Sequence, residues 1–265
     1  MIRQTAVAGT FYPNNCEELH QQFQHFNDIL ENSNFNATIN FTPKAIIVPH
    51  AGYVYSGFTA NVAYSLLKNV QAKRVVVIGP SHKFSFKGAS ISLFDEFQSP
   101  CGNLKIDKAF ANHLQNEFDF LTFNEQVHCE HSTETQMPFI QYYLPNSEAV
   151  EIVYSDISKD KISELLSYIL KNCEDTLLVI STDLSHFYDL QKANLLDNIA
   201  LEAIKNLSLE TWDKGTEACG RTGVKAIIKT ANEFSLKSEV LDYRTSYDVS
   251  NDDSSVVGYM SAIIG

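Results

Sequence analysis

The 265-residue sequence contains no C-x-x-C pair, although it has five cysteines. They are odd in number and spread widely along the chain, at Cys16, Cys101, Cys129, Cys173 and Cys219. This distribution argues against a disulfide framework and against a structural zinc knuckle. We therefore expect reduced thiols.

The sequence also lacks a basic run and a long apolar run. It has 20 Lys and Arg against 32 Asp and Glu, a formal charge of −12, and such a surface repels phosphate backbones and anionic lipid. No stretch approaches the roughly 18 apolar residues that span a membrane, and the start, MIRQTAVAGTFYP, has no apolar core behind a basic end. We expect a cytoplasmic protein that binds neither nucleic acid nor membrane.

No internal repeat, low-complexity tract or Pro/Gly/Ser-rich linker marks a domain boundary. Hydrophobic residues make up 44% of the chain, which is enough for a full core. These features predict a single domain over residues 1–265.

Apolar, β-rich runs alternate with segments of helical periodicity. The runs lie at 44–49, 74–79, 149–154 and 176–181, and the helical segments at 58–68, 132–144, 158–171, 188–206 and 217–231. Continuous apolar runs suit strands that are buried on both faces. The alternation predicts an α/β fold, a mostly parallel doubly wound sheet flanked by helices.

The end of the chain departs from this alternation. Two strand-like runs, 238–246 and 254–264, are joined by a polar loop in which we expect no helix. They predict an antiparallel C-terminal strand pair at one edge of the sheet. The stretch 95–130 is the least regular part of the sequence.

Three histidines follow predicted strands directly: His50, His82 and His186. Ligands of open α/β sheets bind beyond the carboxyl ends of the strands, and imidazole is the commonest neutral metal ligand. Each histidine taken alone suits an ordinary loop residue. Together they predict one polar, metal-binding site.

Two histidines and one anionic group form the ligand set of non-haem iron sites, so a third ligand is needed. The candidates are Asp183, three residues before His186, and Cys219, which opens a predicted helix. The helix dipole and Arg221 would favour the thiolate of Cys219. The alternative for Cys219 is a small buried residue at a helix contact.

A fourth polar cluster covers residues 128–136. We expect Glu130, His131 and Glu134 to orient the metal ligands or to contact substrate. Two alternatives stay open: His128 and His131 form a separate metal pair, or the segment is a solvated helix cap with Ser132 as the N-cap.

Seven motifs resemble those of one family. They run in order over essentially the whole chain: RQTAVAGTFYP at the start, VPHAGYVYSG at 48–57, GPSHK at 79–83, EHSTETQMPF at 130–139, STDLSH at 181–186, EACGRTGV at 217–224 and SSVVGYMSAII at 254–264. This set resembles the Memo family, also called AmmeMemoRadiSam system protein B.

The resemblance implies a fold similar to that of the class III (LigB-type) extradiol dioxygenases. His50 and His82 then correspond to two iron ligands, Cys219 stands where the dioxygenases place a carboxylate, and His186 resembles their proton-transfer histidine. Asp183 would orient His186 or join the ligands. Iron (Fe²⁺) is the expected metal, with copper or zinc as alternatives, because a thiolate softens the site.

The leading hypothesis is therefore a metal-dependent redox enzyme. The alternatives are a module that binds a peptide or small-molecule ligand without chemistry, and metal-assisted hydrolysis. The family name implies partnership with an AMMECR-type protein and a radical-SAM enzyme. Tyr53, Tyr55 and Tyr259 either line the pocket or pack in the core.

Overall fold

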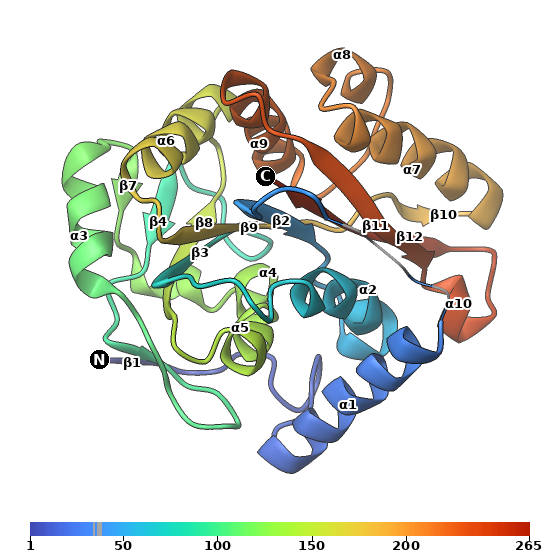
Figure 1. Ribbon diagram of the computed structural model, residues 1–265, viewed down its shortest axis with the longest axis horizontal. Helices are drawn as coiled ribbons and strands as arrows, with labels where there is room; N and C mark the ends of the chain where they lie inside the picture. The colour runs from blue at the N-terminus through green and yellow to red at the C-terminus, as the bar shows by residue number, and fades with distance from the viewer. Residues whose placement is uncertain (34, 36–38) are drawn as a thin grey trace.

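Four parallel strands form the centre of the main sheet (Figure 1). In spatial order they are β2 (Ala45–Val48), β9 (Thr176–Ser181), β3 (Arg74–Pro80) and β8 (Glu148–Tyr154). Nearly all of their residues are buried, which explains why their sequences show no alternation of polar and apolar residues. The computed structural model describes residues 1–33, 35 and 39–265.

Antiparallel strands complete the sheet beside β2. Strand β12 (Val256–Ile264) pairs with β2 and, along its length, with β11 (Ser238–Thr245). The predicted C-terminal strand pair is therefore confirmed. Strand β10 (His186–Tyr188) pairs with the start of β12.

The connection between β11 and β12 was expected to contain no helix, and this is wrong. A single helical turn, α10 (Tyr247–Ser250), lies there. Asp248 accepts a hydrogen bond from the backbone N–H of Thr245 at 2.7 Å, which closes the turn locally. A polar segment this short carries no helical periodicity.

The edge of the main sheet beside β8 is formed by β4 (Ala89–Ile91) and by part of the stretch 95–130. Strand β4 is antiparallel to β8 and parallel to β7 (Leu121–Thr122). A small separate sheet joins β1 (Ile2–Arg3), β5 (Glu96–Phe97) and β6 (Leu104–Lys105). Helix α3 (Lys108–Glu117) and the 3₁₀ turn η1 (Glu125–His128) complete this region.

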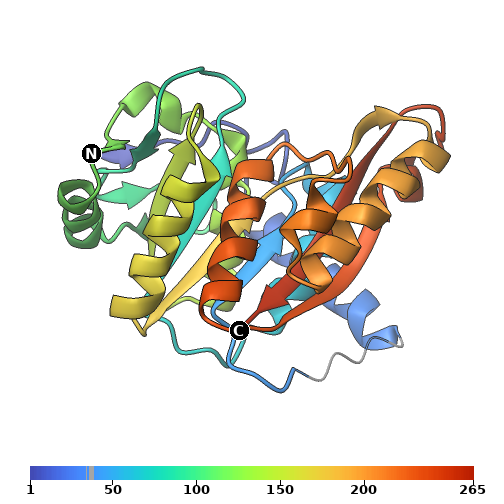
Figure 2. The ribbon, with the colours of Figure 1, turned by 90° about the horizontal axis from the view of Figure 1, so that it is seen from above.

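Helices cover both faces of the main sheet (Figure 2). One face carries α6 (Lys159–Asn172), α7 (Leu190–Lys205), α8 (Leu209–Trp212) and α9 (Arg221–Glu233), and the other carries α1 (Cys16–Asn32), α2 (Tyr53–Ser65) and α5 (Met137–Tyr143). Alternate residues of β3 supply the two cores: Val76 and Ile78 face the first set, Val75 and Val77 the second. The predicted α/β fold is confirmed.

The segment 132–144 is not one helix, contrary to expectation. It divides into α4 (His131–Glu134) and α5, with Pro138 in the first turn of α5. Proline lacks a backbone N–H and therefore starts a helix more readily than it continues one. The N-cap of α4 is Glu130, whose side chain accepts from the N–H of Ser132, so the alternative of Ser132 as N-cap is also wrong.

The expectation of reduced thiols throughout is corrected by a disulfide between Cys16 and Cys101. These residues are 85 positions apart and become neighbours because the start of α1 lies beside the turn at 99–102. The spacing of the two cysteines along the sequence does not predict this contact. Cys129, Cys173 and Cys219 are free.

Within the described residues, none of the helices has both the length and the apolar character required to cross a membrane.

Candidate metal centre

The parallel strands bring two of the predicted histidines to the same edge of the sheet. His50 follows β2 and His82 follows β3, and the carboxyl ends of parallel strands converge there. His131, the first residue of α4, joins them. Ligand nitrogens of His50, His82 and His131 all lie within 4.8 Å of one another.

Two glycines permit the close packing around this cluster. A Cβ atom at Gly79, near the end of β3, would come within 2.6 Å of the Ser132 Oγ in α4. A Cβ atom at Gly220 would come within 2.7 Å of the backbone oxygen of Ser181. Both contacts are too short for any side chain, so glycine lets α4 and the start of α9 approach the sheet.

The ring of His50 is held by the end of β9. Its Nδ1 lies 2.9 Å from the Oγ of Ser181, and the Ser181 hydroxyl donates its own proton to the carbonyl of Ser132. Ser181 therefore accepts from the Nδ1–H of His50, which leaves the lone pair on Nε2. A metal-binding histidine is oriented by this kind of hydrogen bond.

Glu130 orients the other two rings. Its Oε1 lies 3.0 Å from the Nδ1 of His82 and 2.9 Å from the Nδ1 of His131, and its Oε2 accepts from the backbone N–H of His82 at 2.7 Å. Burial raises the pKa of Glu130, but the hydrogen bonds from His131 and His82 outweigh it and hold the pKa well below its usual range. The charged carboxylate accepts from both rings, so each keeps its Nε2 lone pair for a ligand.

Burial also keeps His50 neutral. Its side chain is 1% exposed, and desolvation, followed by the charges of His82 and His131, lowers its pKa well below the ordinary value of 6.5. A neutral imidazole is the form that binds a metal.

Cys219 lies directly beside His50. Its Sγ is 3.1 Å from the Nε2 of His50 and accepts a hydrogen bond from the backbone N–H of Asp183 at 3.2 Å. Burial and the nearby Asp183 raise the pKa of the Cys219 thiol to about 12. Without a bound metal, burial therefore favours the thiol form of Cys219 over the expected thiolate. Cys219 lies before the first turn of α9, and the Arg221 side chain is exposed.

A family model described as Memo-like protein matches residues 3–263 of the chain. The chain belongs to the Memo-like protein family. Similar relatives include MEMO1 family proteins of Methanobrevibacter smithii (35% identical, 99% of both chains covered), Aquifex aeolicus (34%, covering 99% of this chain and 98% of the relative) and Thermoplasma volcanium (31%, with the same coverages).

One solved structure is also similar. An uncharacterized protein from Escherichia coli K12 aligns with this Memo-like chain at a TM-score of 0.54 and 13% identity, covering 84% of this chain and all of the other. This likeness shows that the two proteins share a fold.

His186 and Asp183 lie on the β12 side of the cluster. In this Memo-like chain, the Nδ1 of His186 lies 2.7 Å from the carbonyl of Leu184, so it donates there and leaves Nε2 as an acceptor. Asp183 is buried and accepts from the backbone N–H of His50 at 2.8 Å. Burial raises the pKa of Asp183.

The structure places three of the predicted site residues away from the histidine cluster. Glu134 is fully buried and accepts from the backbone N–H groups of Ala6 and Val7 and from the Tyr12 hydroxyl, so it holds the N-terminal segment. Tyr53 is buried and donates to the carbonyl of Thr135 at 2.6 Å. The third, Arg221, faces solvent.

The prediction for His131 was that it orients the metal ligands or contacts substrate, and the structure places its ring with those of His50 and His82. The sequence does contain an indication of this placement, because Glu130 directly precedes His131, and a carboxylate beside a histidine is typical of metal-binding histidines. The alternative pairing of His128 with His131 is wrong. The ring of His128 is buried between Glu151 and Ser90, with contacts of 2.8 and 2.9 Å.

Proposed function

We propose that this Memo-like protein is a metal-dependent redox enzyme whose single metal ion, Fe²⁺, is held by His50, His82 and His131 with Cys219 as a further donor. The observation that carries the proposal is the cluster of three imidazoles whose ligand nitrogens lie within 4.8 Å of one another. Each ring has its Nδ1 engaged by Ser181 or Glu130.

The donor set suits this metal. Imidazole ligands bind iron, copper and zinc, and a thiolate shifts the preference toward copper(I), zinc or an electron-rich iron. When bound, a redox metal with open positions would supply activation of dioxygen and of an electron-rich substrate. The chain's own residues would hold the metal, position the substrate and move protons.

His186 is the residue that we assign to proton transfer. Its Nδ1 donates to the Leu184 carbonyl, so its Nε2 is left as the acceptor for a proton from the substrate. The neighbouring Phe187 has a φ of 65°, and the pairing register shifts between His186 and Tyr188. Such irregularities of an edge strand re-aim side chains at functional sites.

The substrate that we propose has an apolar or aromatic part. Large hydrophobic side chains are exposed within five residues of three of these histidines: Val54 (66%) and Tyr55 (44%) after His50, Phe84 (42%) after His82, and Phe187 (76%) after His186. Exposed apolar side chains near a polar site are typical of ligand-binding surfaces.

The test is dioxygen consumption by protein loaded anaerobically with Fe²⁺ and then given a panel of catechols. We expect uptake that depends on the metal and falls at least a hundredfold in a His186→Gln variant that keeps its iron. The matched control is His113→Gln, a change at an exposed histidine beside Tyr168. Binding of catechols without dioxygen uptake would contradict the enzyme proposal and favour a ligand-binding module.

A further inference from the structure

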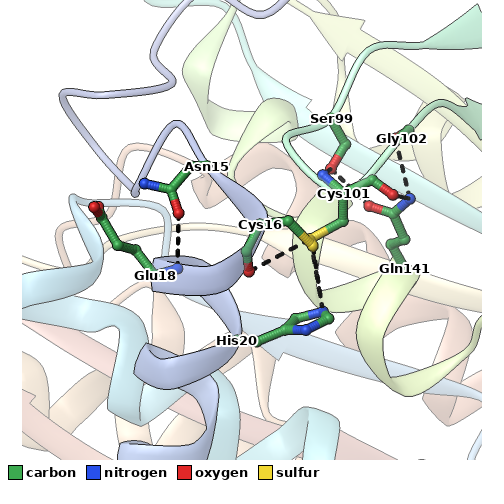
Figure 3. Close-up of a disulfide and its surroundings, with 8 residues drawn as sticks. All are labelled: Asn15, Cys16, Glu18, His20, Ser99, Cys101, Gly102 and Gln141. Carbon is green, nitrogen blue, oxygen red and sulfur yellow. Dashed lines mark hydrogen bonds between the residues drawn. A yellow bond between two sulfur atoms is a disulfide. The ribbon is translucent and has the colours of Figure 1, made fainter.

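A second group of side chains that could bind a metal, separate from the histidine cluster, lies at the start of α1. Figure 3 shows its members, Cys16, His20 and Cys101. Cys16 and His20 are four residues apart on this helix and therefore share one face. Cys101 comes from the turn at 99–102 and is joined to Cys16 by the disulfide. His20 is exposed and both cysteines are partly exposed, so reductants and metal ions reach the cluster.

The distances from His20 match those between two ligands of one zinc ion. Its Nε2 lies 3.6 Å from the Sγ of Cys101 and 3.8 Å from the Sγ of Cys16. In a tetrahedral zinc site with Zn–S near 2.3 Å and Zn–N near 2.0 Å, a nitrogen and a sulfur ligand lie ~3.6 Å apart. Only the two sulfurs must separate, from bonding distance to ~3.8 Å.

The turn that carries Cys101 and the helix that carries Cys16 are each held in place by contacts other than the disulfide. The side chain amide of Gln141 in α5 donates to the carbonyls of Cys101 and Gly102 at 3.3 and 3.1 Å, and Ser99 donates to Gln141 at 2.6 Å. Helix α1, which carries Cys16, is packed into the core by Leu19 and Phe23, each of which is 1% exposed. Reduction therefore leaves the two thiols facing His20.

We propose that Cys16, His20 and Cys101 form a redox-controlled zinc site. The disulfide has no thiolate and binds no zinc. Reduction produces two thiols that bind one Zn²⁺ together with the Nε2 of His20, leaving a fourth position for water, as in a zinc site with three protein ligands.

The chemistry balances with a low-molecular-weight thiol as the reductant. Two thiol molecules become one disulfide, and the Cys16–Cys101 bond takes up two electrons and two protons by thiol–disulfide exchange. Zinc binding then releases those two protons, because the ligands are thiolates. Oxidised glutathione reverses the reduction and expels the metal.

The experiment compares zinc binding by reduced and oxidised full-length protein, in competition with a chromophoric chelator. We expect the reduced form to bind one more Zn²⁺ than the form treated with oxidised glutathione. The extra zinc disappears in Cys16→Ser and binds at least tenfold more weakly in His20→Gln, an exposed position whose replacement leaves the core intact. It is retained in Cys173→Ser, the matched cysteine control.

The result is distinguishable from metal binding at the histidine cluster, because a His82→Ala variant must keep the redox-dependent difference. Equal zinc binding by the reduced and oxidised forms would overturn the proposal. So would an extra zinc that survives in both Cys16→Ser and His20→Gln.

Discussion

The Nε2 of His50 lies 3.1 Å from the sulfur of Cys219, so a buried neutral imidazole contacts a partly buried thiol. The two side chains come from the loop after β2 and from the turn before α9, and they are 169 positions apart. A metal ion that binds both must displace the thiol proton. If the proposed metal binds here, its affinity therefore depends on the acid–base state of this pair.

The first prediction concerns this proton. Because burial and Asp183 raise the pKa of Cys219 to about 12, the thiol is protonated at neutral pH and the binding-competent thiolate grows as the pH rises. We expect the Fe²⁺ affinity of the wild type to rise by ~10-fold more per pH unit than that of Cys219→Ser. Competition titrations between about pH 6 and pH 8 measure the Fe²⁺ affinity of both proteins. An equal dependence of affinity on pH in the two proteins would show that the sulfur does not bind the metal.

The second prediction concerns Glu130, which holds both His82 and His131. Glu130→Gln replaces one acceptor oxygen by an NH₂ group, so at least one ring loses its orienting partner. Loss of such a partner lowers metal affinity by roughly 10- to 100-fold. The control is Glu125→Gln, an exposed residue nearby. Unchanged affinity in Glu130→Gln would remove Glu130 from the site.

The third prediction concerns stability. Glu134 is fully buried, pairs with Arg3 and accepts from two backbone N–H groups of the N-terminal segment. Breaking a buried ion pair costs roughly 3–5 kcal/mol, so we expect Glu134→Gln to lose about 3 kcal/mol of unfolding free energy in urea. Iron stoichiometry should stay unchanged. A loss below about 1 kcal/mol, the level of exposed pairs, would contradict this role.

The fourth prediction is a dependence of stability on acid. Burial raises the pKa of Glu151, but the charge of Arg3 and the interactions with His128 and Thr133 outweigh it and lower the pKa below its ordinary value of 4.5. The carboxylate therefore stabilises the fold above that value, and this stability is lost as the pH falls below it. The difference in unfolding free energy between wild type and Glu151→Gln should shrink below pH 4.5. A difference that is constant with pH would contradict the assignment.

The sequence predicted the sheet because its central strands are buried on both faces and read as continuous apolar runs, as at 74–79. It predicted the meeting of His50 and His82 because parallel strands end at the same edge. Short edge strands such as β4 and β7 were not predicted, because two or three residues are too few to show the alternation that is typical of a strand.

The rest of the site depends on contacts between distant segments. Whether His131 binds a metal or only orients a metal ligand depends on how α4 packs against β3. There, the absence of a side chain at Gly79 leaves room for Ser132. The Cys16–Cys101 bond depends on the packing of α1 beside the turn at 99–102. The protonation of Cys219 depends on its desolvation beside Asp183, which outweighs the hydrogen bonds from the backbone N–H groups of Asp183 and Gly220.

The measurement that tests the central claim most directly is the iron content of anaerobically loaded protein, compared between wild type and His131→Gln, with His113→Gln as the control. We predict one Fe²⁺ per chain in the wild type and in the control, and at least a tenfold weaker affinity in His131→Gln. Full iron retention in His131→Gln, or no bound iron in the wild type, would contradict a metal centre built on His50, His82 and His131.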